Sequence, residues 1–288
     1  MIKLFLYKKE NPLFQKKTPY EKEWELLLKK ENKFLEKRQE KKESSLTKKL
    51  EENIPEKLQE TLNTAFAKAF TLVFEKGTGI IEKTYKKDEI EQNFQINQYA
   101  NEIKQSRKSL QTFSKQAKGT GMKNMLLSGV SGIGMGVLGI GIPDIPVFTA
   151  MLLKNLYEIA LHFGYHYDSP QEQYFILLLI QGGVSCGEDM LVIDKAIQDY
   201  INTNHLPPSY QKEEMIQKTS SYLSKELLYM KFLQGIPVVG AVGGAYDVIY
   251  LKQITEYANL KYQKRFLQSF VIKKEKGIKN EYATSNHE

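Results

Sequence analysis

The stretch Ser169-Pro170-Gln171-Glu172, followed by the apolar run Tyr174–Gln181, decides the fold class of this 288-residue chain. Taken by itself, the apolar run has the composition of a buried strand. The four residues before it are a helix start, because serine is a favoured N-cap, proline suits the first helical position and glutamate follows three residues after the cap. The sequence therefore predicts a helix here.

Apolar residues at three- and four-residue steps predict helices throughout the rest of the chain. One such stripe runs from Leu58 to Val73, and we expect Gly77 and Gly79 to end it. Gly164 is expected to stop another helix in the left-handed conformation. Further helices are predicted over residues 19–57, 85–118, 147–163, 189–201, 213–233 and 247–270. Since no alternating strand pattern occurs, the expected fold is all-α, a compact multi-helix bundle with glycine-rich apolar hairpins.

Charge is unevenly distributed along the chain, which carries 41 Lys+Arg and 34 Asp+Glu, a net +7. Residues 119–190 are acidic and charge-poor, whereas both flanking regions are basic. We expect a charged N-terminal helical arm over residues 1–57, a helical domain over 58–272 and a polar tail over 273–288. Mixed-sign charge such as that of the arm is typical of a solvated helix face. The single cysteine, Cys186, and the early interruption of the N-terminal apolar run favour a cytoplasmic location.

Two apolar segments are rich in glycine and contain the small-xxx-small pairs Gly132/Gly136 and Gly240/Gly244. Such pairs allow close helix approach. The first segment has the length of a bilayer crossing, but each glycine costs about 1 kcal/mol of helix stability relative to alanine. A tightly packed core and a membrane-associating hairpin therefore both stay open. The residues expected to serve helix packing or membrane contact are Gly129, Gly132, Gly134, Gly136, Gly139, Gly141, Pro143, Asp144, Pro146, Gly235, Pro237, Gly240 and Gly244.

Two glycine motifs resemble enzyme signatures. Gly134–Gly139 matches the dinucleotide fingerprint, but Pro143 and Pro146 would interrupt the helix that must follow it, so we expect no cofactor. Gly183-Val184-Ser185-Cys186-Gly187 matches the nucleophile elbow of serine hydrolases, with Ser185 as the candidate nucleophile. An elbow needs a preceding strand and a downstream histidine; the alternative is a helix crossing lined by small residues.

His162, His166 and Asp168 are the candidate metal ligands, since two histidines four residues apart can share a metal on one helix. Gly164 lies between them and marks a helix end, so the alternative is a set of polar groups in a wet loop. Nucleic acid is not an expected partner, because the basic residues alternate with glutamates and lack an aromatic platform. An anionic membrane surface would attract the same positive charge.

Five segments together carry a resemblance to a known family: Lys76–Glu82, Gly141–Pro146, Ile159–Tyr165, Ile236–Ala241 and Glu256–Ala258. They resemble the EcsC protein family, from about Trp24 to about Phe270. The resemblance implies a bacterial protein associated with an ABC transporter and with protein secretion, and it implies no catalytic residues.

The expected function is thus that of a non-catalytic accessory protein, peripherally associated with an anionic membrane surface, an integral transporter subunit, or both. A serine hydrolase centred on Ser185 and a soluble helical adaptor are the alternatives.

Overall fold

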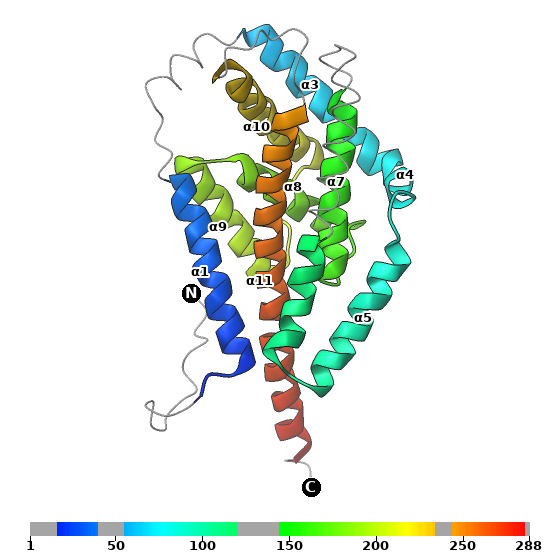
Figure 1. Ribbon diagram of the computed structural model, residues 1–288, viewed down its shortest axis with the longest axis vertical. Helices are drawn as coiled ribbons and strands as arrows, with labels where there is room; N and C mark the ends of the chain where they lie inside the picture. The colour runs from blue at the N-terminus through cyan, green and yellow to red at the C-terminus, as the bar shows by residue number, and fades with distance from the viewer. Residues whose placement is uncertain (1–15, 40–54, 120–143, 234–243, 286–288) are drawn as a thin grey trace.

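The computed structural model describes residues 16–39, 55–119, 144–233 and 244–285, and within these ranges the regular structure is helical throughout (Figure 1). The all-α prediction is therefore confirmed. The helices are α1 (Pro19–Gln39), α3 (Glu56–Leu72), the π-helical η1 (Val73–Gly77), α4 (Thr78–Glu82), α5 (Lys87–Ile103), a helix over residues 107–119, α7 (Asp144–His162), α8 (Pro170–Val184), α9 (Gly187–Thr203), α10 (Lys212–Leu233) and α11 (Gly244–Ser285).

Helix α8 forms the centre of the bundle. Every residue from Tyr174 to Val184 is buried, so this helix is apolar nearly all round and packs against α9, α10 and α11. Its start is as predicted, since the Ser169 side chain accepts a hydrogen bond from the Glu172 N–H at 3.2 Å. The strand-like run is helical because its N-terminus is capped and all its faces have helical neighbours.

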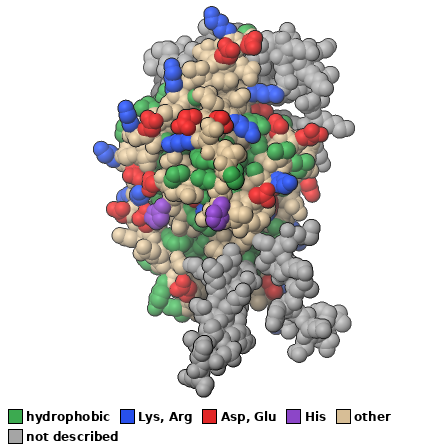
Figure 2. Space-filling view, turned by 180° about the vertical axis from the view of Figure 1, so that it is seen from behind, with side chains coloured by type: hydrophobic (Ala, Val, Ile, Leu, Met, Phe, Trp, Pro, Cys, Tyr) green, Lys and Arg blue, Asp and Glu red, His purple; other side chains and the backbone are tan. Residues whose placement is uncertain are grey.

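Helix α11 runs along the long axis of the molecule, with α1 and α9 on one side and α7 on the other (Figure 1). Helix α1, expected as a charged arm, lies against α11 and α9. Helix α3 crosses the end of the bundle, where it packs on α7 and α10. Seen from behind, basic and acidic side chains are intermixed around apolar ones (Figure 2).

The helix that begins with α3 does not end at Gly77 and Gly79, contrary to the sequence prediction. It continues through one π-helical turn, η1, into α4. The Thr78 hydroxyl donates to the Val73 carbonyl at 3.1 Å, which satisfies a polar group in the widened turn. A glycine in a helix costs stability without dictating a stop, and here the packing of Val73, Phe74 and Ile81 into the core outweighs that cost.

The single helix predicted over residues 85–118 is also wrong, because the chain breaks between α5 and the helix at residues 107–119. Ser106 and Ser109 exchange hydrogen bonds, each N–H donating to the other's hydroxyl oxygen at 3.1 Å. This reciprocal cap starts the second helix and folds the two into a hairpin.

Gly164 ends α7 as predicted, with a φ of +79°. A Cβ at this position would lie 2.2 Å from the ring of Phe94, so glycine is also required here because it has no side chain. This close contact brings α5 against the end of α7.

Candidate functional site

Most of the glycine and proline residues predicted for helix packing or membrane contact lie outside the described residues. Those outside are Gly129, Gly132, Gly134, Gly136, Gly139, Gly141, Pro143, Gly235, Pro237 and Gly240. Asp144 begins α7, Pro146 lies in its first turn and Gly244 begins α11. Proline is tolerated there because the first helical turn needs no backbone donor.

Ser185, the candidate nucleophile, lies at the C-terminal end of α8 and is 3% exposed. The segment before it is helical, so the strand that a nucleophile elbow requires is not formed. Its hydroxyl donates to the Gln181 carbonyl at 2.7 Å. His205, a histidine downstream of Ser185, lies in the exposed loop after α9 and contacts Thr203.

Two glycines before Ser185 allow α8 and α11 to approach closely. A Cβ on Gly183 would lie 2.6 Å from the Cα of Ile254, and one on Gly182 would lie 2.5 Å from the ring of Tyr257. Since real Cβ atoms do not approach other atoms so closely, this segment has the geometry of a helix crossing lined by small residues.

The candidate metal ligands do not come together. His162 is buried in α7 and not in a wet loop, and burial lowers its pKa to about 4. His166 is exposed and its Nδ1 lies 3.6 Å from Glu91, while Asp168 is exposed. Within the described ranges, no group of three or more His, Cys, Asp or Glu side chains is placed to hold a metal ion.

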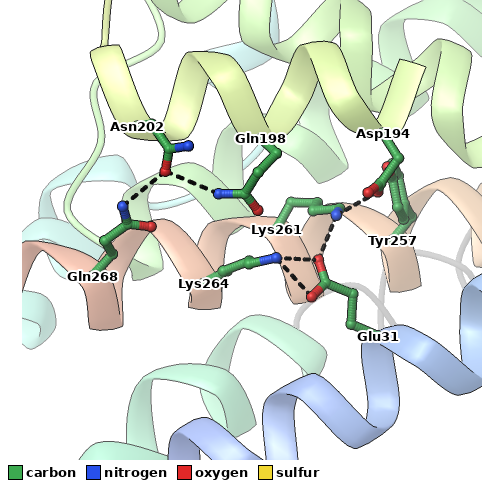
Figure 3. Close-up of polar contacts among 8 residues, drawn as sticks. All are labelled: Glu31, Asp194, Gln198, Asn202, Tyr257, Lys261, Lys264 and Gln268. Atoms are coloured by element: carbon green, nitrogen blue, oxygen red, sulfur yellow. Dashed lines mark hydrogen bonds and ion pairs between the residues drawn. The ribbon is translucent and has the colours of Figure 1, made fainter. Parts of the chain in front are cut away.

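The structure instead brings charged side chains together along one face of α11, at its contact with α1 and α9 (Figure 3). We call Glu31, Asp194, Tyr257, Lys261 and Lys264 the α11 seam. Lys261 is fully buried and pairs with Glu31 and with Asp194, the latter at 2.5 Å. Lys264 pairs with Glu31 at 2.8 Å, and the Tyr257 hydroxyl donates to Asp194 at 2.6 Å. The two lysines and two carboxylates balance, so the seam buries no net charge.

Electrostatic effects within the α11 seam act in opposite directions. Burial lowers the pKa of Lys264; the Glu31 carboxylate opposes this shift, and the charge of Lys261 adds to it. A buried ion pair adds little net stability over apolar residues of similar volume, but the loss of one partner is strongly destabilising. The seam therefore fixes how α1 lies on the bundle.

Two further charged residues attach α1 on either side of Glu31. Glu23 is 2% exposed and accepts hydrogen bonds from Gln111 at 2.9 Å and Gln263 at 3.2 Å. At the other end, Arg38 donates to the carbonyls of Gly183 at 2.6 Å and Ser185 at 3.0 Å. These carbonyls end α8, where a cation is favoured by the helix dipole.

The sequence interpretation missed this set because mixed Lys/Glu composition predicted a solvated face. The signal was the register: the residues 23, 27, 31, 34 and 38 are spaced by three and four and share one helix face. Leu27 and Phe34 are the buried apolar members of that face. A charge in line with buried apolar residues is itself expected to be buried and paired.

An apolar stripe on α5 is exposed. Ile96, Tyr99 and Ile103, here called the α5 stripe, are 64%, 67% and 69% exposed and lie on one helix face. The opposite face packs on the helix at residues 107–119, where the Asn97 side-chain amide donates to Gln116 Oε1 at 2.9 Å and Asn101 Oδ1 accepts from the Ser109 hydroxyl at 2.7 Å. Large apolar side chains gathered on an outer face are typical of an interaction surface.

The residues that follow the α5 stripe are strongly basic. Residues 104–118, here called the basic segment, contain five cations and no carboxylate: Lys104, Arg107, Lys108, Lys115 and Lys118. All five are exposed. The face in Figure 2, by contrast, intermixes both signs. The hairpin thus combines an apolar outer stripe with a positively charged second helix.

None of the helices in the described part of the chain is long and apolar enough to cross a membrane.

A protein-family model described as the EcsC protein family matches residues 21–267. The match begins in α1 and ends in α11, so it includes the α11 seam, the α5 stripe and the basic segment. No curated protein and no solved structure matches the chain significantly.

Proposed function

We propose that this chain, which belongs to the EcsC protein family, is a non-catalytic helical protein that docks peripherally on an anionic membrane surface. The single observation that carries the proposal is the hairpin of α5 and the helix at residues 107–119. Its first helix carries the α5 stripe and its second helix carries most of the basic segment, and the two meet in the chain at Ile103 and Lys104.

The apolar part of the proposal rests on the chemistry of the α5 stripe. Isoleucine side chains favour the acyl boundary of a bilayer, and tyrosine favours the interface, where its ring is apolar and its hydroxyl can stay hydrated. The outer face around the stripe carries Gln92 and Gln95, which add no charge. An amphipathic helix of this kind lies in the plane of the interface and does not cross the bilayer.

The electrostatic part rests on the basic segment. Each Lys or Arg close to an anionic surface contributes about 1 kcal/mol of attraction. The acidic residues of α5 are concentrated in its first turns, at Asp88, Glu89 and Glu91, whereas only Glu102 lies near the basic segment. Attraction is therefore strongest at the hairpin tip, where Ile103 is also exposed.

More specifically, the protein acts on the cytoplasmic side of a bacterial membrane, beside an ABC transporter active in protein secretion. The family resemblance supports this part of the proposal. The glycine-rich segments at residues 129–141 and 235–244 would add contacts to the bilayer or to a transporter helix.

Co-sedimentation with vesicles tests the proposal, with phosphatidylglycerol-containing vesicles compared with pure phosphatidylcholine. The wild-type protein should pellet with the anionic vesicles and stay largely in solution with the neutral ones. Replacement of the α5 stripe, Ile96→Ser/Tyr99→Ser/Ile103→Ser, should weaken binding by about tenfold or more, because roughly 25 cal/mol is lost for each Å² of apolar area no longer buried. Gln92→Ser/Gln95→Ser on the same helix should leave binding unchanged.

A charge-matched pair of variants tests the electrostatic part. A variant with Lys104→Gln, Lys108→Gln, Lys115→Gln and Lys118→Gln loses four charges from the basic segment. It should bind anionic vesicles more weakly by up to about a thousandfold. The control removes four exposed lysines of α3, η1 and the turn after α4, namely Lys57, Lys68, Lys76 and Lys83. Equal weakening by both variants, or equal binding to neutral vesicles, would overturn the proposal.

A further inference from the structure

We infer that docking on an anionic membrane loosens the N-terminal half of α1, because Arg107 serves both the membrane-facing basic segment and the buried Glu23 of α1. The inference rests on the proposed function and describes its regulation. The first half of α1 would be released from the bundle when the membrane is bound.

Glu23 forms an ion pair with Arg107. The Arg107 Nε lies 3.3 Å from Glu23 Oε2, while the other partners of this carboxylate, Gln111 and Gln263, are neutral amides. The Glu23 side chain is 2% exposed and that of Arg107 is 47% exposed. The pair therefore joins a buried carboxylate to a cation that solvent, or a lipid headgroup, can reach.

Positive charges converge around this contact. Burial lowers the pKa of Lys30, the charge of Lys118 lowers it further, Glu23 opposes this and Arg107 adds to it. Lys30 of α1 thus lies within electrostatic range of two cations of the basic segment. A phosphate headgroup would be attracted to the three cations together, and it would compete with Glu23 for the guanidinium of Arg107.

Loss of Arg107 would leave Glu23 as a buried carboxylate without its ion pair, with Lys30 of the same helix as a cation in electrostatic range. Such a group is costly, and the helix can relieve the cost by moving Glu23 into water. The other attachments of α1 use residues outside the basic segment: Glu31 is held by Lys261 and Lys264, and Arg38 by the end of α8. Loosening should therefore be confined to the first half of α1, about Pro19–Leu27.

Hydrogen exchange of the full-length protein, followed by mass spectrometry of peptides, tests this inference. The protein is measured alone, with phosphatidylglycerol-containing vesicles and with phosphatidylcholine vesicles, and the same samples are sedimented to measure the bound fraction. We expect anionic vesicles to accelerate exchange several-fold in peptides covering residues 19–27. Exchange in residues 31–39 and 250–268 should be unchanged.

Two single-charge variants separate the contact with Glu23 from charge in general. Arg107→Gln should accelerate exchange over residues 19–27 without vesicles, and vesicles should add little more. Lys108→Gln removes a neighbouring exposed charge from the same segment, so it should weaken binding to a similar extent. It should leave the exchange of free α1 slow and preserve the acceleration by vesicles, once bound fractions are matched.

Each outcome decides one of the two proposals. Wild-type protein that is bound to anionic vesicles with unchanged or slower exchange over residues 19–27 overturns the inference and leaves the proposed function standing. Slow exchange in free Arg107→Gln also overturns it. Failure of the wild-type protein to bind anionic vesicles overturns the proposed function, and the inference with it.

Discussion

Glu31 and Lys261 illustrate at the residue scale how this bundle uses charge inside a helix contact. Lys261 has no exposed surface, and Glu31 is 3% exposed. Glu31 meets both lysines of the α11 seam, so its removal would leave Lys264 without its carboxylate and Lys261 with Asp194 alone. The carboxylate therefore links α1 to two buried or nearly buried cations of α11.

Replacing this carboxylate should be strongly destabilising. Glu31→Gln is expected to lower the free energy of unfolding by about 3 kcal/mol or more, because breaking a buried ion pair leaves uncompensated charge in the interior. Glu36→Gln, an exposed position on the same helix, should change it by less than about 0.5 kcal/mol. Urea titration followed by circular dichroism measures both. Similar values for the two variants would contradict the role given to the α11 seam.

His162 should make stability depend on pH. Burial lowers its pKa from the ordinary value of 6.5 to about 4, so between these values the unfolded chain takes up a proton that the folded protein does not. The free energy of unfolding should therefore fall as the pH drops from 6.5 towards 4, by up to about 3 kcal/mol. His162→Gln should flatten this dependence, whereas His166→Gln at the surface should not. Identical pH profiles for wild type and His162→Gln would rule the assignment out.

At the element scale, local sequence signals located most helices, packing decided that one of them continues past Gly77, and a missed local signal marks where another breaks. The cap at Ser169 and the stop at Gly164 are local features, and both were predictable. The continuation through Gly77 depends on a π-turn and on core packing by α4, which no short pattern encodes. The break before residue 107 left a signal that the prediction missed, a pair of serines three residues apart.

The start of α8 also shows how one residue can fit a local sequence pattern and make its contacts with a distant helix. Glu172 follows Ser169 at capping-box spacing, yet its carboxylate does not turn back to the cap. It accepts hydrogen bonds from Tyr262 and Arg265 of α11, both at 2.7 Å. The sequence therefore identified the helix start correctly, while the tertiary partner of Glu172 could not be predicted from it.

Substitutions of Ser169 and Glu172 should lower the free energy of unfolding by different amounts. Ser169→Ala removes one capping hydrogen bond and should cost about 1 kcal/mol of unfolding free energy. Glu172→Gln removes the carboxylate that pairs with the largely buried Arg265 and should cost about 3 kcal/mol. Thermal unfolding monitored by circular dichroism shows which of the two variants is less stable. A larger effect for Ser169→Ala would mean that Glu172 acts mainly in the cap.

At the scale of the whole molecule, charge has two separate roles. Paired charges on α1, α9 and α11 fasten the N-terminal helix, while the cations of the basic segment are exposed on the hairpin that also carries the α5 stripe. The sequence predicted a basic periphery and membrane contact through glycine-rich segments at residues 129–141 and 235–244. It did not identify the α5 stripe, because three apolar residues on a helix are as consistent with a core face as with an outer one.

This division of charge leads to an expected outcome for the protein in cells that produce it. If contact is made by an interfacial helix and a basic segment, high-salt washing should release much of the membrane-bound protein, because at about 1 M salt exposed charges more than about 3 Å apart are largely screened from one another. Carbonate should release the rest, and the variant lacking Lys104, Lys108, Lys115 and Lys118 should be recovered without washing. Immunoblots of each fraction measure the distribution. Release by detergent alone would contradict peripheral docking and would direct attention to an apolar segment outside the described helices as a membrane span.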